Sequence, residues 1–204
     1  MSTDFPPRVA QGSTQPWRER LPLPAADRMD EAQRRAAQAL IDGPRKGVYG
    51  PFLPLLRSPE LMDRVARVGE YLRFDGVLAP RIRELVTCAA ARHVSNQFEW
   101  LMHAPLARQA GVAEATLEAL RQGARPRGLP ADEEAALDFV QEMLRQHGSS
   151  EPAYAAALQA FGEQGVVELA TLAGYFVMVS WVMNVAHTPP LAGAQGEPLP
   201  AFPL

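Results

Sequence analysis

Helical periodicity runs through nearly the whole centre of this chain, and it restricts the possible folds more than any other feature. Between Asp27 and His187, apolar residues recur at spacings of three and four, and glycines and prolines divide the pattern into segments of helical length. The sequence lacks the strict alternation of apolar and polar residues that marks a half-buried strand. The pattern therefore predicts an all-α domain of about seven or eight helices.

Prolines separate the two ends of the chain from this helical centre. Residues 1–26 contain five prolines and little periodicity, which excludes a continuous helix or a central strand. We interpret them as an arm that is either disordered or wrapped over the domain or a neighbouring subunit, where it would cover Phe5 and Trp17. Residues 188–204 form a Pro/Gly-rich tail, so residues 27–187 are expected to form the single folded domain.

Capping residues predict where several helices begin. Asp27, Ser58 and Asp132 each precede a segment with helical period, and Pro59 suits a first helical turn. The helix after Ser58 is expected to bury one face, which consists of Leu61, Val65, Val68 and Leu72. The segment from Pro44 to Pro59 is rich in glycine and proline, and a loop of this length inside a compact domain is often functional.

Composition argues against several classes of protein. The 204-residue chain has a formal net charge of −3 without a basic cluster, which disfavours nucleic-acid binding. Its single cysteine, Cys88, excludes an internal disulfide, a dithiol redox centre and a cysteine-based zinc site. The apolar run from Val166 to Ala186 carries Glu168 and Asn184, so we interpret it as a buried helix and not as a membrane span. The first residues do not have the form of a signal peptide, and a cytoplasmic location is expected.

Acidic and imidazole side chains gather within one apolar stretch, residues 80–111. Pro80 begins a helix that carries Glu84, and Ser95 and Asn96 interrupt it. Asn96 is a suitable N-cap for a second helix, on which Asn96, Glu99 and His103 share one face. Glu84 can face this row of side chains if the two helices pack closely.

Two carboxylates, an amide and an imidazole in apolar surroundings suit proton transfer. Burial raises the pKa of a carboxyl group and can keep one glutamate protonated near neutral pH, while histidine shuttles the proton. Structural roles compete with this interpretation, because Asn96 and Glu99 can cap a helix and His103 can be a hydrogen-bonded core residue. Glu84 can pair with an arginine instead, or join Glu99 and His103 as metal ligands, although the sequence has no HExxH motif.

A weak internal repeat relates the two halves of the domain. Residues 81–85 resemble residues 165–169 at a shift of 84, and the same shift places His103 onto His187. We interpret the repeat as two related helical halves, of which the first keeps polar residues inside and the second is mostly apolar.

The motifs around these residues resemble the carboxymuconolactone decarboxylase-like family, also called the AhpD-like superfamily. RxREL followed by NxxEWxxHAPLAxxAG carries the resemblance, together with GPFLPLLRSPELMDRVARVGEYLRF upstream and GVVELATLAGYF downstream. The resemblance covers about residues 30–190. It implies an all-helical fold with related halves, and a homo-oligomer that is usually a trimer or hexamer.

The family contains two chemical branches. The thiol branch uses a CxxC pair, a histidine and an upstream glutamate to reduce peroxides or a partner enzyme. Here Asn96 and Glu99 stand at the two cysteine positions, so that thiol relay is disfavoured. The other branch is similar to γ-carboxymuconolactone decarboxylase, a lyase of aromatic compound catabolism that uses neither a cofactor nor a metal.

The second branch implies a cofactor-independent lyase, a decarboxylase that acts on a small carboxylated lactone or keto acid. His103 would be the general acid, Glu99 would orient it or hold the proton, and Glu84 would tune them both. Asn96 would donate to the oxyanion. A dianionic substrate would need arginines, of which Arg81, Arg83 and Arg92 are nearest in sequence. Two alternatives stay open: a peroxide-related antioxidant protein, and a helical oligomer that binds a small molecule without chemistry.

Overall fold

The structure is a computed structural model that describes residues 18–194 and 196–200. Over these residues it contains helices and no strand, which confirms the all-α prediction. A 3-10 turn (Ala26–Arg28) precedes the first helix, and a π-helical turn (Tyr71–Asp75) follows the third. The helices are α1 (Glu31–Asp42), α2 (Phe52–Leu55), α3 (Pro59–Glu70), α4 (Pro80–His93), α5 (Gln97–Gln109), α6 (Glu114–Arg121), α7 (Ala131–Gln146) and α8 (Glu151–Ala186).

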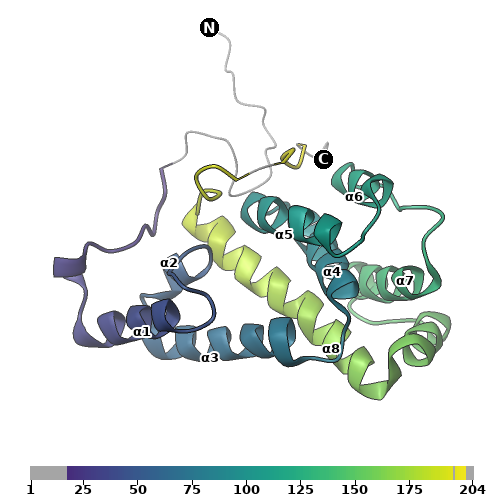
Figure 1. Cartoon of the computed structure of the whole chain (residues 1–204), viewed down its shortest axis with the longest axis horizontal. Coiled ribbons are helices and arrows are strands. Elements are labelled where there is room, and N and C mark those ends of the chain that lie inside the picture. The colour runs from purple at the N-terminus through teal and green to yellow at the C-terminus, as the bar shows by residue number, and fades with distance from the viewer. Residues whose placement is uncertain (1–17, 195, 201–204) are drawn as a thin grey trace, which may run out of the picture.

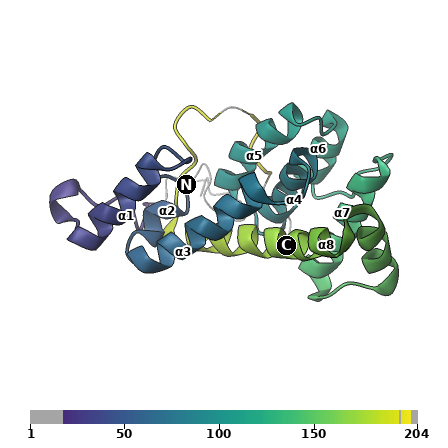
Figure 2. The same ribbon diagram turned by 60° about the horizontal axis from the view of Figure 1, so that its bottom comes forward.

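Helix α4 occupies the centre of the domain. It contacts α5, α6, α7 and α8, and every residue from Glu84 to Arg92 is buried. A helix that is enclosed on most sides is apolar around most of its circumference. This explains why residues 85–91 are all small or apolar, with Thr87 as the one hydroxyl side chain among them. In Figure 1, α1–α3 lie at one end of the molecule, α6 and α7 lie at the other, and α8 runs between the two ends. Figure 2 shows α8 beneath α3 and α4.

Helix α8 consists of two helical segments joined at Gly162, whose backbone is not helical (φ 68°, ψ 177°). The break divides α8 into a short first segment and a longer second segment that contains the apolar run. By length and composition alone α8 could cross a membrane, but 56% of its most apolar window is buried inside the domain. That burial supports the interpretation of the apolar run as a core helix.

Two of the predicted caps are wrong, and in both cases another interaction takes the place of the cap. Helix α1 begins after Asp30, whose side chain accepts from the backbone N–H of Gln33 while the Gln33 side chain accepts from that of Asp30. This reciprocal capping box satisfies two backbone donors, so Asp27 lies in the preceding 3-10 turn instead. Helix α7 begins at Ala131, and Asp132 forms an ion pair with Arg81 of α4.

The predicted buried face of α3 is confirmed at two positions and wrong at the other two. Pro59 occupies the first turn as expected, but the Ser58 side chain makes no capping hydrogen bond within the described chain. Val65 and Leu72 are buried as expected, whereas Leu61 and Val68 are exposed. The buried face also contains Met62, Ala66 and Gly69, each of which follows a predicted position by one residue. Ala66 and Gly69 are small, which suits close contact with the helices behind α3.

The described parts of the arm and of the tail both pack on the helical domain. The backbone N–H of Arg20 donates to the Ala186 carbonyl at the end of α8 (2.8 Å), and Arg57 donates to carbonyls of the arm. In the tail, the Gln97 side chain donates to the Leu199 carbonyl (2.7 Å) and accepts from the Leu199 N–H (2.9 Å). Phe5 and Trp17, which we expect the arm to cover, lie outside the described residues.

Gly50 fixes the loop between α1 and α2 against α5. Its φ is +60°, and a Cβ at this position would lie 2.6 Å from the Phe98 ring. We expect G50A to lower the free energy of unfolding by about 1–2 kcal/mol through the left-handed backbone, and by a further ~1–3 kcal/mol through the clash. The matched control is G128A, where φ is +68° and a Cβ meets nothing within 4 Å. Equal losses in chemical denaturation would contradict this close packing of the loop.

Candidate active site

The turn between α4 and α5 is anchored on α8 by two amide side chains. Asn96 caps α5, because its Oδ1 accepts from the backbone N–H of Glu99 (2.9 Å). Its Nδ2 donates to Oδ1 of Asn184 (2.7 Å) and to the Ser180 carbonyl (3.3 Å). Asn184 in turn donates to the Val94 carbonyl (3.0 Å). The two asparagines therefore hold the start of α5 against α8.

Asn96 does not join the predicted row of catalytic side chains in this structure. Its oxygen and its nitrogen are both engaged by the turn and by α8. Its contribution to the site is to set the direction of α5, on which Glu99 and His103 lie one turn apart. Asn184, which the sequence analysis did not assign to the site, shares this function; its only signal was an amide within an apolar run.

His103 lies between two carboxylates, and all three side chains are buried. Its Nδ1 is 2.6 Å from Oε2 of Glu84 on α4, and its Nε2 is 3.2 Å from Oε2 of Glu99 on α5. A neutral imidazole can donate from only one nitrogen, whereas an imidazolium donates from both. The geometry therefore favours a charged His103 that donates to both glutamates. The structure brings together three of the four predicted site residues.

The charge distribution differs from the expected one. Burial alone would lower the pKa of His103, but the hydrogen bonds and charges of Glu84 and Glu99 outweigh it and raise the pKa to about 9. Burial likewise acts to raise the pKa of Glu84, yet the hydrogen bond and charge of His103 bring it below the usual value. The prediction that burial keeps a glutamate protonated is thus wrong for Glu84, whose pKa is lowered by its contact with His103.

A cavity of about 50 Å³ adjoins this triad. Glu99 and His103 line it, whereas Glu84 lies behind His103 and does not. The ring of Phe176 meets the His103 ring edge-on, with centroids 5.0 Å apart. The same cavity is lined by Arg45, Tyr49, Arg73 and Tyr175. Acid–base groups and cationic groups thus meet at one small space.

A loop, a π-helical turn and α8 deliver these additional side chains. Arg45 and Tyr49 come from the Gly/Pro-rich segment after α1, which the sequence analysis predicted to be functional. Arg73 comes from the π-helical turn, a feature that is common at functional sites. Gly69 makes room for them, because a Cβ there would lie 2.2 Å from the Tyr175 hydroxyl and 2.7 Å from Nη2 of Arg45.

The three arginines that the sequence placed nearest to the site do not line this cavity. Arg81 pairs with Asp132 and Glu133 of α7. Arg83 donates to the Leu78 carbonyl, although its charge contributes to the lowered pKa of Glu84. Arg92 is buried elsewhere along α4. Proximity in sequence was misleading, because none of the residues that line the cavity belongs to α4.

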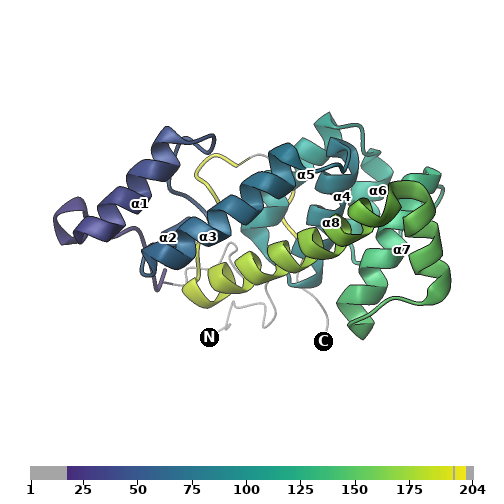
Figure 3. The ribbon, with the colours of Figure 1, turned by 90° about the horizontal axis from the view of Figure 1, so that it is seen from below.

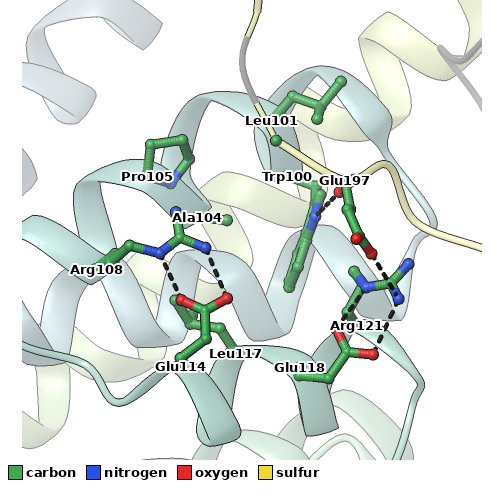
Figure 4. Close-up of a pocket in the computed structure, with 11 residues that line it drawn as sticks. Trp100, Leu101, Ala104, Pro105, Arg108, Glu114, Leu117, Glu118, Arg121 and Glu197 are labelled. Atoms are coloured by element: carbon green, nitrogen blue, oxygen red, sulfur yellow. Dashed lines mark hydrogen bonds and ion pairs between the residues drawn. The ribbon is translucent and has the colours of Figure 1, made fainter.

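A larger cavity of about 640 Å³ lies on the other side of α5, between α6 and the tail (Figure 4). Trp100, Ala104 and Arg108 of α5 line it. Its charged groups pair with one another: Arg108 with Glu114 (2.5 Å), and Arg121 with Glu118 (2.7 Å) and Glu197 (3.0 Å). Because these charges are already neutralised and no histidine lines this cavity, we place the candidate active site at the smaller one.

Cys88 cannot act as a peroxide-reactive thiolate in this environment. Its side chain is fully buried, and desolvation followed by the charges of Glu84 and Glu99 raises the pKa of the thiol well above its usual range. Within residues 18–194 and 196–200, no cluster of three or more His, Cys, Asp or Glu side chains has a metal-binding arrangement. Both His103 nitrogens already face carboxylates.

Comparisons with known proteins agree with this fold and with the family resemblance. Residues 59–142 match the carboxymuconolactone decarboxylase family. An uncharacterized peroxidase-related protein from Silicibacter sp. TM1040 aligns with a TM-score of 0.70 at 19% identity, over 90% of this chain and 98% of its own. A second peroxidase-related protein, from Ralstonia eutropha JMP134 and with an alkylhydroperoxidase AhpD core, aligns with a TM-score of 0.68 at 18% identity. This alignment covers 84% of this chain and 92% of the other. No curated protein matches the chain by sequence. The fold is therefore AhpD-like, as predicted.

The raised pKa of His103 predicts how stability depends on pH. Relative to its ordinary value of 6.5, the folded pKa of about 9 means that the folded state binds one more proton between these values. The stabilising contribution is complete below pH 6.5 and is lost as pH rises through about 9, with a slope of about −1.4 kcal/mol per pH unit. Denaturant titrations should show this decrease for wild type and for H93Q, which changes an exposed histidine, but not for H103Q. An equal slope in H103Q would contradict the assignment.

Proposed function

We propose that this chain, whose residues 59–142 match the carboxymuconolactone decarboxylase family, is a cofactor-independent carboxy-lyase for a small carboxylated lactone or keto acid. One observation carries the proposal: a histidine whose two ring nitrogens both face buried carboxylates, an arrangement that favours its charged form, forms part of the wall of a cavity. Such a group can deliver a proton near neutral pH without any cofactor.

The reaction needs one proton donor and one place for negative charge. The bond between the substrate carbon and its carboxylate breaks, carbon dioxide leaves, and the electron pair moves through the unsaturated system onto the carbonyl oxygen. The resulting enolate then takes a proton at carbon from Nε2 of His103. His103 regains a proton from solvent, so the net reaction converts the carboxylate anion and one proton into carbon dioxide and the decarboxylated product.

The two glutamates have different roles in this scheme. Glu84 accepts from Nδ1 of His103 (2.6 Å) and is not exposed to the cavity, so it orients the ring and stabilises its charge. Glu99 lines the cavity and makes the longer contact to Nε2 (3.2 Å), which a substrate can replace at smaller cost. Asn96 positions α5 through its capping bond. Glu99 can accept a proton from Nε2 of His103 or return one to it, and so can relay the proton that His103 regains from solvent.

The size of the cavity limits what enters without rearrangement. A volume of about 50 Å³ accommodates a carboxylate group or one to two water molecules. We expect the ring of a lactone to enter by displacing flexible lining side chains such as Met102 and Leu106. The peroxide-related alternative receives no support from Cys88, because that thiol is fully buried and its pKa is raised.

Turnover of candidate acids tests the proposal. We expect wild type to release carbon dioxide from an unsaturated γ-lactone acid or a β-keto acid, and kcat to fall as pH rises through about 9, where His103 loses its proton. H103Q should lower kcat by about 100-fold or more, and C88A, outside the cavity, should leave it unchanged. Equal turnover by wild type and H103Q would remove His103 from the mechanism. Binding of the acids without turnover by wild type would favour a non-catalytic binding protein.

We further propose that the protein self-associates through the outer face of α8. The exposed residues of this face are spaced alternately by four and three, as in a coiled-coil seam, and carry no charge: Val167, Thr171, Gly174, Met178, Trp181 and Val185. Figure 3 shows α8 along one side of the molecule. Since 60% of the Trp181 side chain is exposed, a second copy of the helix would bury apolar surface that water now contacts.

The mass in solution tests this interface. We expect wild type to form a trimer or hexamer in analytical ultracentrifugation, and W181E to shift it toward monomer, because the glutamate would be buried without a partner. Y154E, which changes an exposed tyrosine before the Gly162 break, is the matched control and should keep the wild-type mass. A monomeric wild type, or one that binds phospholipid vesicles through α8 instead of self-associating, would contradict the proposal.

A further inference from the structure

Arg45 faces the cavity with one nitrogen, Nε, that donates no hydrogen bond to its described surroundings. Only 9% of its surface is exposed, and its Nε has no hydrogen-bond partner among the described residues. Its Nε forms a long ion pair with the Glu70 carboxylate (3.7 Å), and Nη2 makes a long contact of 3.4 Å with the Ala66 carbonyl. The guanidinium lies 4.5 Å from the centre of the Phe52 ring. A buried guanidinium whose ion pair is this long is stabilised further when an anion in the cavity accepts closer hydrogen bonds from it.

Arg73 is a second cation that lines the same cavity. Unlike Arg45, it has no ion-pair partner in the described chain. Its guanidinium lies over the Phe74 ring at 5.2 Å, and its charge contributes to the lowered pKa of Glu84. The loop after its π-helical turn is fixed by Glu168, which accepts from the Tyr71 hydroxyl (2.8 Å) and from the Val77 N–H (2.7 Å). Arg73 is therefore held at the cavity by the backbone and is not paired there.

Tyr175 completes the group. Burial raises the pKa of Tyr175 to about 12, although the charges of Arg45 and Arg73 act in the opposite direction. The phenol therefore keeps its proton at neutral pH and can donate a hydrogen bond. Its hydroxyl and Nη2 of Arg45 both approach Gly69, which places them side by side.

We propose that Arg45, Arg73 and Tyr175 form a subsite that binds a carboxylate which the substrate keeps through the reaction. Guanidinium groups and a neutral hydroxyl are donors, and a carboxylate offers about four acceptor positions for them. The subsite rests on the proposed function, because it presumes a substrate with a second carboxylate or an equivalent anion. Glu99 and His103 are then left for the reacting carbon, so the subsite selects the acid over its neutral amide and fixes which end of the substrate meets His103.

Binding of a substrate-like molecule that cannot react tests the subsite apart from catalysis. The probes are a saturated γ-lactone carboxylate and its carboxamide, measured by calorimetry against wild type, R73M, R45K and H103Q. R67M serves as the matched control, because Arg67 is an exposed arginine of α3 that pairs with Asp63. Thermal melting checks that each variant is folded, and R45K keeps the buried charge while it loses the planar donor geometry.

We expect wild type, R67M and H103Q to bind the carboxylate at least about tenfold more tightly than the carboxamide. R73M should lose about 10- to 100-fold in affinity for the carboxylate alone, and R45K should lose part of it. Wild-type affinity in folded R73M and R45K, or no preference for the acid in wild type, would overturn the subsite. If instead the acid binds through Arg73 and no lactone or keto acid turns over, the subsite stands and the proposed function fails.

Discussion

The contact of His103 with Glu84 and Glu99 is the interaction on which the rest of the structure depends. Three buried ionisable groups lose their hydration, and only close mutual contacts offset that loss. Glu84 belongs to α4 and the other two residues belong to α5, so the contact exists only while these helices stay in close register. A buried charge cluster of this kind is weak evidence for stability and better evidence for function.

Much of the surrounding fold keeps this register. Asn96 and Asn184 join the start of α5 to α8. The backbone of Leu199 forms two hydrogen bonds with the side chain of Gln97 on the first turn of α5. Gly69 lets Tyr175 and Arg45 approach α3 at a distance that a larger residue would prevent. The site is thus supported by contacts with α8, the tail and α3, while the cationic side chains come from a loop and a π-helical turn. This division suits a fixed proton donor beside an adaptable binding surface.

Periodicity and spacing were sufficient to predict the helical class and the meeting of Glu84, Glu99 and His103. The i, i+4 relation of Glu99 and His103 is fixed by the helix itself, and Glu84 needed only that two successive helices pack together. Arg45, Arg73 and Tyr175 could not be found in this way. They come from three separate elements whose meeting depends on tertiary contacts, and the π-helical turn that directs Arg73 leaves no signal in the periodicity. The protonation of His103 could not be predicted from the sequence either, because it depends on the contacts that its two ring nitrogens make with Glu84 and Glu99.

The protonation of the His103 ring is the most direct test of the central claim, that two carboxylates hold a charged histidine ready to donate a proton. Nitrogen NMR of the imidazole at pH 7.5 reports on each ring nitrogen separately. The structure predicts that both Nδ1 and Nε2 carry a proton, and that E84Q makes the ring easier to neutralise. A neutral ring with one unprotonated nitrogen in wild type at this pH would contradict the account, because His103 would then be an acceptor where a donor is required.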